Sequence, residues 1–190
     1  MNTTLASVMV TRYWPRLDSR LRDALLVLTG SLVVAAMAQV RIPLPFTPVP
    51  LTGQTFAVLL VSAALGSRRG AGSLLLYLLA GTAGLPFFAG GASELAYLSG
   101  PTGGYLIGFV LAAYVVGRLA ETGRDRHFLA AIATFLIGEV LIYIPALIWL
   151  SAWIGPQHAL VSGLLPFLAG DAIKLVAAAL ALPAAWKLVR

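Results

Sequence analysis

Long apolar runs, separated by short polar segments or by segments rich in proline and glycine, make up most of the chain. A helix needs roughly 20 mostly apolar residues to cross the hydrocarbon core of a bilayer. The pattern therefore predicts an all-α membrane protein, a bundle of six transmembrane helices. We expect the chain to form a single integral membrane domain (1–190), with a basic lead-in at 1–22 and spans at about 24–40, 51–65, 71–83, 102–119, 128–150 and 164–186.

The composition agrees with this class. Hydrophobic residues make up 59% of the 190 residues and charged residues only 11%, and the mean hydropathy is +0.92. A net charge of +6 would suggest a nucleic-acid partner in a soluble protein. Here the basic residues flank the apolar runs, so we expect the lipid bilayer and no nucleic acid as the partner.

The basic residues also predict an orientation. The N-terminal segment, the turns at 66–70 and 118–127 and the C-terminus contain every Lys and Arg except Arg41 and Lys174. Because cytoplasmic segments carry an excess of Lys and Arg, we expect a multi-pass protein of the cell (cytoplasmic) membrane with both termini cytoplasmic. The loops around 41–50, 85–100 and 150–162 then face outward.

Two opposite charges interrupt the last span. Asp171 and Lys174 lie about 10–16 Å into the run when counted from its start at 1.5 Å per residue. A charge at that depth costs on the order of 2.5–3.5 kcal/mol, and the three-residue spacing places both side chains on one helical face. The pair is either a structural ion pair or a polar site inside the bundle. Glu139, near the middle of the fifth run, has the same two interpretations.

The loops on the outward side are unusual. Pro43, Pro45, Pro48 and Pro50 forbid a helix and favour an extended, stiff and largely apolar loop. The segment 85–100 is rich in glycine and also irregular. Irregular backbone near a bilayer is tolerated where it lines a cavity, so we expect a ligand cavity that these loops cap from outside.

Several kinds of chemistry are excluded. The chain has no Cys, and Lys174 and Lys187 are its only lysines, neither preceded by the glycine of a nucleotide phosphate loop. His127 and His158 have no neighbours at metal-ligand spacing, so no metal site is expected. No hydrolase motif occurs. We therefore expect no enzyme activity and no cofactor, and any energy for transport must come from a partner or an ion gradient.

Four segments together resemble a known family. They are Pro-Val-Pro-Leu-Thr-Gly-Gln-Thr (48–55), Gly-Leu-Pro-Phe-Phe-Ala-Gly-Gly (84–91), Gly-Pro-Thr-Gly-Gly-Tyr-Leu-Ile-Gly-Phe (100–109) and Gly-Asp-Ala-Ile-Lys (170–174). They are similar to BioY, the biotin-specific substrate-binding (S) component of energy-coupling factor (ECF) transporters. The resemblance implies six helices, an externally open biotin pocket, and a transmembrane T component and two cytoplasmic ATPase subunits as partners.

The resemblance also implies roles for residues. Asp171 and Lys174 correspond to the ligand-contacting pair of the family. Small residues of the first helix dock on the T component, which implicates Ser31, Ala35 and Ala38. Family members often carry a basic residue just before the Gly-Pro-Thr-Gly-Gly-Tyr segment, where this chain has Ser93 and Glu94. The resemblance therefore assigns no anchor to the carboxylate of biotin.

The chemistry of biotin suggests the rest of the site. A carboxylate can accept from the ureido N–H groups, and an ammonium can donate to the ureido carbonyl or to a carboxylate. We expect biotin to be the transported ligand. The further substrate-binding residues that we predict are Gln54 and Tyr105 for polar contacts, Phe46 and Phe88 for the apolar body, and Thr52 and Tyr97 beside them.

Three alternatives remain open from the sequence. The chain can be an S component or solitary carrier for another small vitamin, sharing the architecture but not the pocket. It can be an intramembrane enzyme that uses Glu139 and Asp171 as an acid and base. It can be a structural subunit that binds no ligand.

Overall fold

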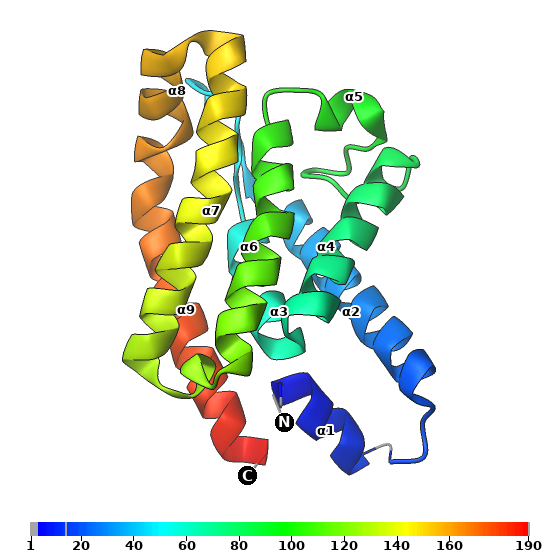
Figure 1. Ribbon diagram of the computed structural model, residues 1–190. Helices are drawn as coiled ribbons and strands as arrows, with labels where there is room; N and C mark the ends of the chain where they lie inside the picture. Colours follow the sequence, from blue (N-terminus) through cyan, green and yellow to red (C-terminus); the bar gives the residue numbers. More distant parts are fainter. Residues whose placement is uncertain (1–3, 14, 190) are drawn as a thin grey trace.

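The computed structural model describes residues 4–13 and 15–189, and most of these residues are helical (Figure 1). Residues 1–3, Trp14 and Arg190, which belong to the predicted basic lead-in and to the C-terminus, lie outside the described residues. The long helices are α2 (Ser19–Gln39), α3 (Gln54–Leu65), α4 (Ser67–Thr82), α6 (Gly103–Glu121), α7 (Phe128–Ile154) and α9 (Leu165–Val189). The short elements are α1 (Leu5–Tyr13), β1 (Arg41–Ile42), β2 (Leu51–Thr52), α5 (Glu94–Leu98), η1 (Arg124–Arg126) and α8 (Pro156–Gly163).

Each predicted span contains one long helix. Four stretches of the described chain are long and apolar enough to cross a membrane, namely α2, α6, α7 and α8 together with α9. The helix α3 has 12 residues and is therefore about 18 Å long, shorter than the hydrocarbon core of a bilayer. The chain is thus a helical membrane protein.

The structure corrects three local predictions. The segment 66–70 is not a separate turn, because α4 begins at Ser67 and carries the basic residues in its first turn. The loop expected around 150–162 is instead the last turn of α7 followed by the helix α8. The predicted span 51–65 begins with extended backbone rather than helix, because Leu51 and Thr52 form β2. This strand pairs with β1 across the proline-rich loop.

The helices surround α6, which packs against α3, α4 and α7. In Figure 1, α7 and α9 lie on one side of α6, and α2 and α4 on the other. The helices α5 and α8 lie at one end of the molecule, called the loop end below. The described ends of the chain, α1 and the last turns of α9, lie together at the opposite end.

Two glycines allow α6 to touch α7 backbone to backbone. A Cβ added to Gly104 would stand 2.5 Å from the Pro145 carbonyl oxygen, and one added to Gly108 would stand 2.7 Å from that of Ile142. Such close approach is typical of helix contacts in membranes, where small residues let packing forces act over a large area. This contact gives the centre of the molecule a rigid frame.

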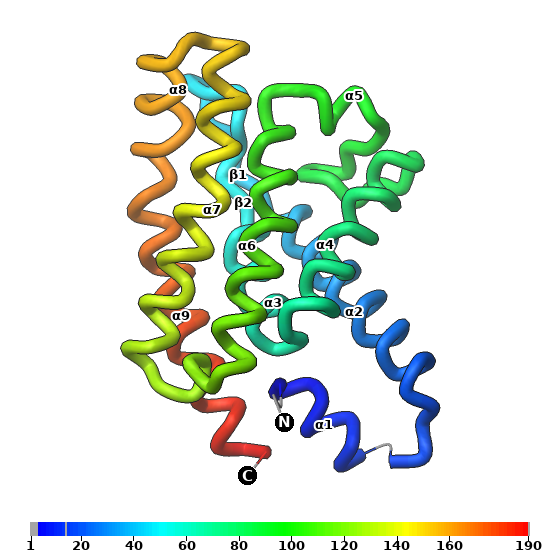
Figure 2. The backbone as a smooth tube through the Cα atoms, in the orientation of Figure 1, coloured from blue at the N-terminus to red at the C-terminus, as the bar shows by residue number. Residues whose placement is uncertain are grey.

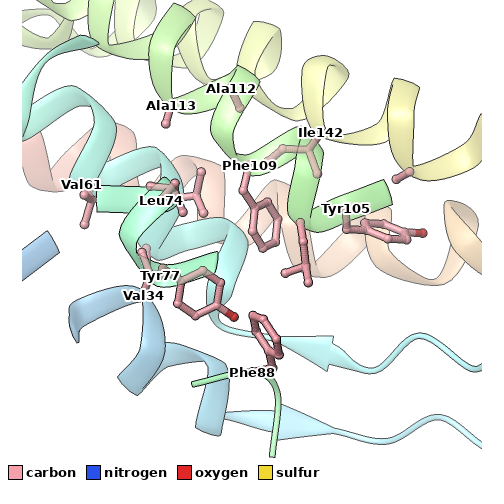
Figure 3. Close-up of a cluster of buried hydrophobic side chains, with 14 of the residues drawn as sticks. Val34, Val61, Leu74, Tyr77, Phe88, Tyr105, Phe109, Ala112, Ala113 and Ile142 are labelled. Carbon is pink, nitrogen blue, oxygen red and sulfur yellow. The ribbon is translucent and has the colours of Figure 1, made fainter. Parts of the chain in front are cut away.

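The main core lies between α2, α3, α4, α6 and α7 (Figure 3). Tyr77 and Phe88 are fully buried and face each other edge to face, with ring centroids 5.6 Å apart. Phe109 projects from α6 towards the same region, and the contact of Phe88 with Tyr77 attaches the glycine-rich segment to the bundle. The loop end is anchored by aromatic packing as well as by the backbone.

The small residues predicted to dock a partner are buried within the chain. Ser31 and Ala38 have no exposed surface, and Ala35 is 7% exposed. Next to them, a Cβ on Gly30 would stand 2.4 Å from the Ser73 hydroxyl oxygen. The small residues therefore serve the close packing of α2 on this chain's own helices, and docking of a partner at Ser31, Ala35 and Ala38 stays a prediction.

Candidate substrate-binding site

Four polar side chains from three helices form one hydrogen-bonded cluster. Lys174 Nζ lies 2.9 Å from Asp171 Oδ1 and 3.1 Å from Thr55 Oγ1. The Thr55 hydroxyl lies 3.1 Å from the same carboxylate oxygen, and the Tyr143 hydroxyl donates to Asp171 Oδ2. Asp171 is only 5% exposed. A buried charge is tolerated when it is paired and hydrogen-bonded, and every oxygen of this carboxylate has a partner.

The positions of these residues follow from their helices. Asp171 and Lys174 are one turn apart on α9 and thus share a face. Thr55 is the second residue of α3, which begins where the extended strand β2 ends. Tyr143 lies on α7 one turn after Glu139. The cluster therefore ties α3, α7 and α9 together near the middle of the molecule.

A second polar group lies next to the cluster. Gln54 is 5% exposed; its amide donates to the Tyr77 hydroxyl at 2.7 Å and accepts from the Thr52 hydroxyl at 3.0 Å. The Tyr105 hydroxyl donates to the Gly163 carbonyl at 2.5 Å. These bonds hold each side chain in one orientation, which is the condition for a preorganised binding site.

A small cavity, called the inner cavity below, adjoins both polar groups. Its volume is about 40 Å³, which is room for about three water molecules at roughly 10–15 Å³ each. The polar lining is Thr52, Gln54, Thr55, Tyr97, Thr102, Tyr105, Tyr143, Asp171 and Lys174, and the apolar lining is Val49, Pro50, Leu106, Phe109 and Phe167.

A larger cavity, called the mouth cavity, lies between the proline-rich loop and the glycine-rich segment at the loop end. Its volume is about 510 Å³. Pro50, Tyr97 and Thr102 line both cavities. Small-molecule sites usually measure roughly 300–1,000 Å³, so the two cavities together have the size of a ligand site, and the mouth cavity leads to its polar end.

The sequence matches a sequence model described as the BioY family over residues 5–190. The chain belongs to the BioY family. A biotin transporter BioY of Thermotoga maritima is 39% identical over 155 residues, which cover 81% of this chain and 88% of the relative. A biotin transporter BioY of Rhizobium etli is 36% identical over 169 residues, covering 84% and 90%.

The fold of this chain is also found in a solved structure. The chain superposes on a crystal structure of the S-component for biotin from an ECF-type ABC transporter with a TM-score of 0.80. The two chains are 24% identical, and the match covers 90% of this chain and 95% of the other. This likeness concerns the fold.

In this BioY chain, six of the eight predicted substrate-binding residues line the inner cavity. They are Thr52, Gln54, Tyr97, Tyr105, Asp171 and Lys174. Phe46 and Phe88 line neither cavity. Phe46 is 61% exposed on the proline-rich loop, and Phe88 is buried behind Tyr97, whose ring it stacks on at a centroid distance of 5.0 Å. Phe88 therefore does not face the cavity itself but packs against Tyr97, which does.

The sequence analysis missed other residues that line the inner cavity. Thr55 directly follows the predicted site residue Gln54 in the segment 48–55 but is not itself among the predicted residues. Tyr143 lies in a long apolar run. A tyrosine does not stand out there, because its hydroxyl carries no formal charge. The spacing from Glu139 was the available signal, because residues four apart share a helical face.

Glu139 lies beside the site but outside its hydrogen-bond network. It is 7% exposed, and neither carboxylate oxygen accepts a hydrogen bond from any described residue. It lines an apolar groove between α7 and α9 together with Tyr143 and Asp171. No hydrogen bond joins Glu139 to Asp171 within residues 4–13 and 15–189, so the structure offers no support for an acid and base pair.

Proposed function

We propose that this protein binds biotin with high affinity and takes it up across the cytoplasmic membrane as the substrate-specific subunit of an ECF-type transporter. Membership of the BioY family and the names of its relatives support this function. In that role the protein is a transporter subunit and not an enzyme. Biotin is its transported ligand rather than a cofactor.

One structural observation carries the proposal, the Asp171–Lys174 ion pair that lines the inner cavity. The ureido ring of biotin has N–H donors and a carbonyl acceptor but no formal charge. Asp171 can accept from an N–H group, and Lys174 can donate to the carbonyl. A pair with no net charge suits a ring with no net charge, because neither partner leaves an uncompensated charge in the site.

The remaining lining fits the rest of the ring system. Phe109, Phe167, Leu106 and Val49 give the inner cavity an apolar wall, which matches the hydrocarbon and thioether part of the bicyclic body. Because the cavity holds only about 40 Å³, part of its lining must move when the ring enters. The mouth cavity at the loop end shares Pro50, Tyr97 and Thr102 with the inner cavity, which supports the loop end as the entry side.

The proposed topology is a single integral membrane domain with six crossings. The distribution of Lys and Arg supports cytoplasmic termini, and α1 and the end of α9 lie at the same end of the molecule (Figure 1). The loop end then faces outward, in keeping with binding from outside. In this arrangement α3 and α4 cross together with the extended segments that flank them.

The proposed partners are a transmembrane T component and two cytoplasmic ATPase subunits. The chain carries no nucleotide phosphate loop of its own, so ATP-driven uptake needs such subunits. Ser31, Ala35 and Ala38 stay the proposed docking positions on α2, although their side chains pack within this chain.

A ligand panel tests the function. Purified protein in detergent is titrated calorimetrically with biotin, thiamin and riboflavin, and ligand released from freshly purified protein is identified by mass spectrometry. We expect binding of biotin alone and biotin as the copurified ligand. Binding of thiamin or riboflavin in its place would assign the protein to another vitamin, and absence of all binding would leave a structural role.

A further inference from the structure

The mouth cavity has one formally charged residue among the described residues that line it, Arg41. Arg41 is also the only Lys or Arg in segments 41–53, 83–102 and 155–163. In the inner cavity Asp171 and Lys174 neutralise each other at 2.9 Å. Among the described residues that line the two cavities, Arg41 therefore supplies the only positive charge without an acidic partner.

The pairing of β1 with β2 directs Arg41 towards the ligand path. The two strands lie side by side (Figure 2); Arg41 stands opposite Thr52, and Ile42 stands opposite Leu51. Directly opposed residues of an antiparallel pair project from the same face of the ribbon. Thr52 lines the inner cavity, so Arg41 projects from the cavity side of the ribbon while Ile42 and Leu51 project from the other.

A glycine turn receives the guanidinium group. A Cβ on Gly90 would stand 2.1 Å from Arg41 Cζ and 2.3 Å from Nε. The guanidinium group therefore occupies the space that the side chain of any other residue at position 90 would need. Gly90 has φ +71, a conformation that favours glycine. The turn is closed by hydrogen bonds from Phe88 N–H to the Ala92 carbonyl and from Gly91 N–H to the Phe88 carbonyl.

Arg41 also lies close to Tyr97, which lines both cavities. Burial raises the pKa of the Tyr97 phenol, and the positive charge of Arg41 opposes that rise. None of the ion pairs in the described parts of the chain involves Arg41. Glu94, the only acidic residue of the three loop-end segments, is exposed and does not line the mouth cavity.

We propose that Arg41 binds the carboxylate tail of the ligand in the mouth cavity while Asp171 and Lys174 hold its ureido ring in the inner cavity. This assignment rests on the proposed function and adds the residue that selects a ligand with an acidic tail. A guanidinium can hold a carboxylate through two parallel N–H···O bonds. Its seat against Gly90 limits the conformational entropy lost when the tail binds.

The test compares biotin with biotinamide, which keeps the ring and loses the charge of the tail. Both are titrated calorimetrically into the wild type, Arg41→Gln and Arg41→Lys. We expect the wild type to prefer biotin by about tenfold or more, and Arg41→Gln to lose about tenfold for biotin and less than about twofold for biotinamide. Arg41→Lys should lie between them, because an ammonium keeps the charge and loses the fork. The control Glu94→Gln changes the charge at the loop end away from the cavity and should keep the preference.

The outcomes separate this inference from the proposed function. Binding of biotinamide by Arg41→Gln shows that the variant is folded and that the ring site works. If Arg41→Gln keeps the preference for biotin, or loses both ligands equally, or if the wild type shows no preference, the assignment of Arg41 is wrong. If the wild type binds neither ligand, it is the proposed function that fails.

Discussion

Replacing Asp171 by Asn is the most direct challenge to the ring site. The carboxylate accepts from Lys174, Thr55 and Tyr143 in the ligand-free protein. An amide keeps the shape and one acceptor oxygen but removes the charge. A hydrogen bond to a charged group contributes about 1.5–3 kcal/mol, compared with about 0.5–1.5 kcal/mol for a neutral one. The loss of one charge-assisted bond to a ureido N–H therefore costs about 1.4 kcal/mol, which predicts at least tenfold weaker biotin binding.

The assay is calorimetric titration of biotin into purified protein, with Asp125→Asn as the matched control. Asp125 is 1% exposed and accepts from Trp186 Nε1 at 2.5 Å, away from both cavities. Asp125→Asn makes the same chemical change and keeps an acceptor for the indole, so its biotin affinity should stay within about twofold of the wild type. An Asp171→Asn variant that binds biotin as tightly as this control would refute the role of the pair.

Three further predictions follow from the packing, the orientation and the unpaired acid. Gly108→Ala should lower the midpoint of thermal unfolding in detergent, because overpacking costs about 1–3 kcal/mol. The control Gly72→Ala should not lower it, because its Cβ would meet only Val27 at 3.5 Å. Equal effects of the two changes would contradict the close contact of α6 and α7. In intact cells, an impermeant maleimide should label Ser99→Cys and not Arg68→Cys, both at exposed positions, and the reverse pattern would invert the topology. Glu139→Gln should unfold at no lower temperature than the wild type, since its carboxylate has no hydrogen-bond partner in the described chain; a fall in the midpoint would reveal a structural bond.

Sequence reasoning finds most readily the residues whose presence in an apolar run is costly. Asp171 and Lys174 stand out because a charge inside a bilayer must be compensated, and they do lie in one cluster with a cavity beside them. Tyr143 carries no such cost and was missed, although it donates to the same carboxylate. The sequence thus shows where charge is buried more readily than it shows which neutral groups surround it.

Partner choice among apolar and small residues was much harder to predict. Ser31, Ala35 and Ala38 allow a helix to approach closely, but nothing in their spacing says whether that helix belongs to the same chain. Phe88 lies in a family segment, yet only the tertiary structure shows that Tyr97 stands between it and the cavity. The short pair of strands and the helix α8 were also unforeseen, since a few residues carry too little periodicity to predict an element.

The pair of strands β1 and β2 is held together by few hydrogen bonds. Its register is only two residue pairs long, with one further bond from Gly53 N–H to the Val40 carbonyl at 3.0 Å. Backbone hydrogen bonds contribute about 0.5–1.5 kcal/mol each, whereas the α6–α7 contact extends along whole helices. Separating the two strands therefore costs much less free energy than separating α6 from α7. We expect the vitamin to enter and leave when this strand pair opens, while the packing of α6 on α7 stays intact. Amide exchange should therefore be faster at Ile42 and Leu51 than at Gly108.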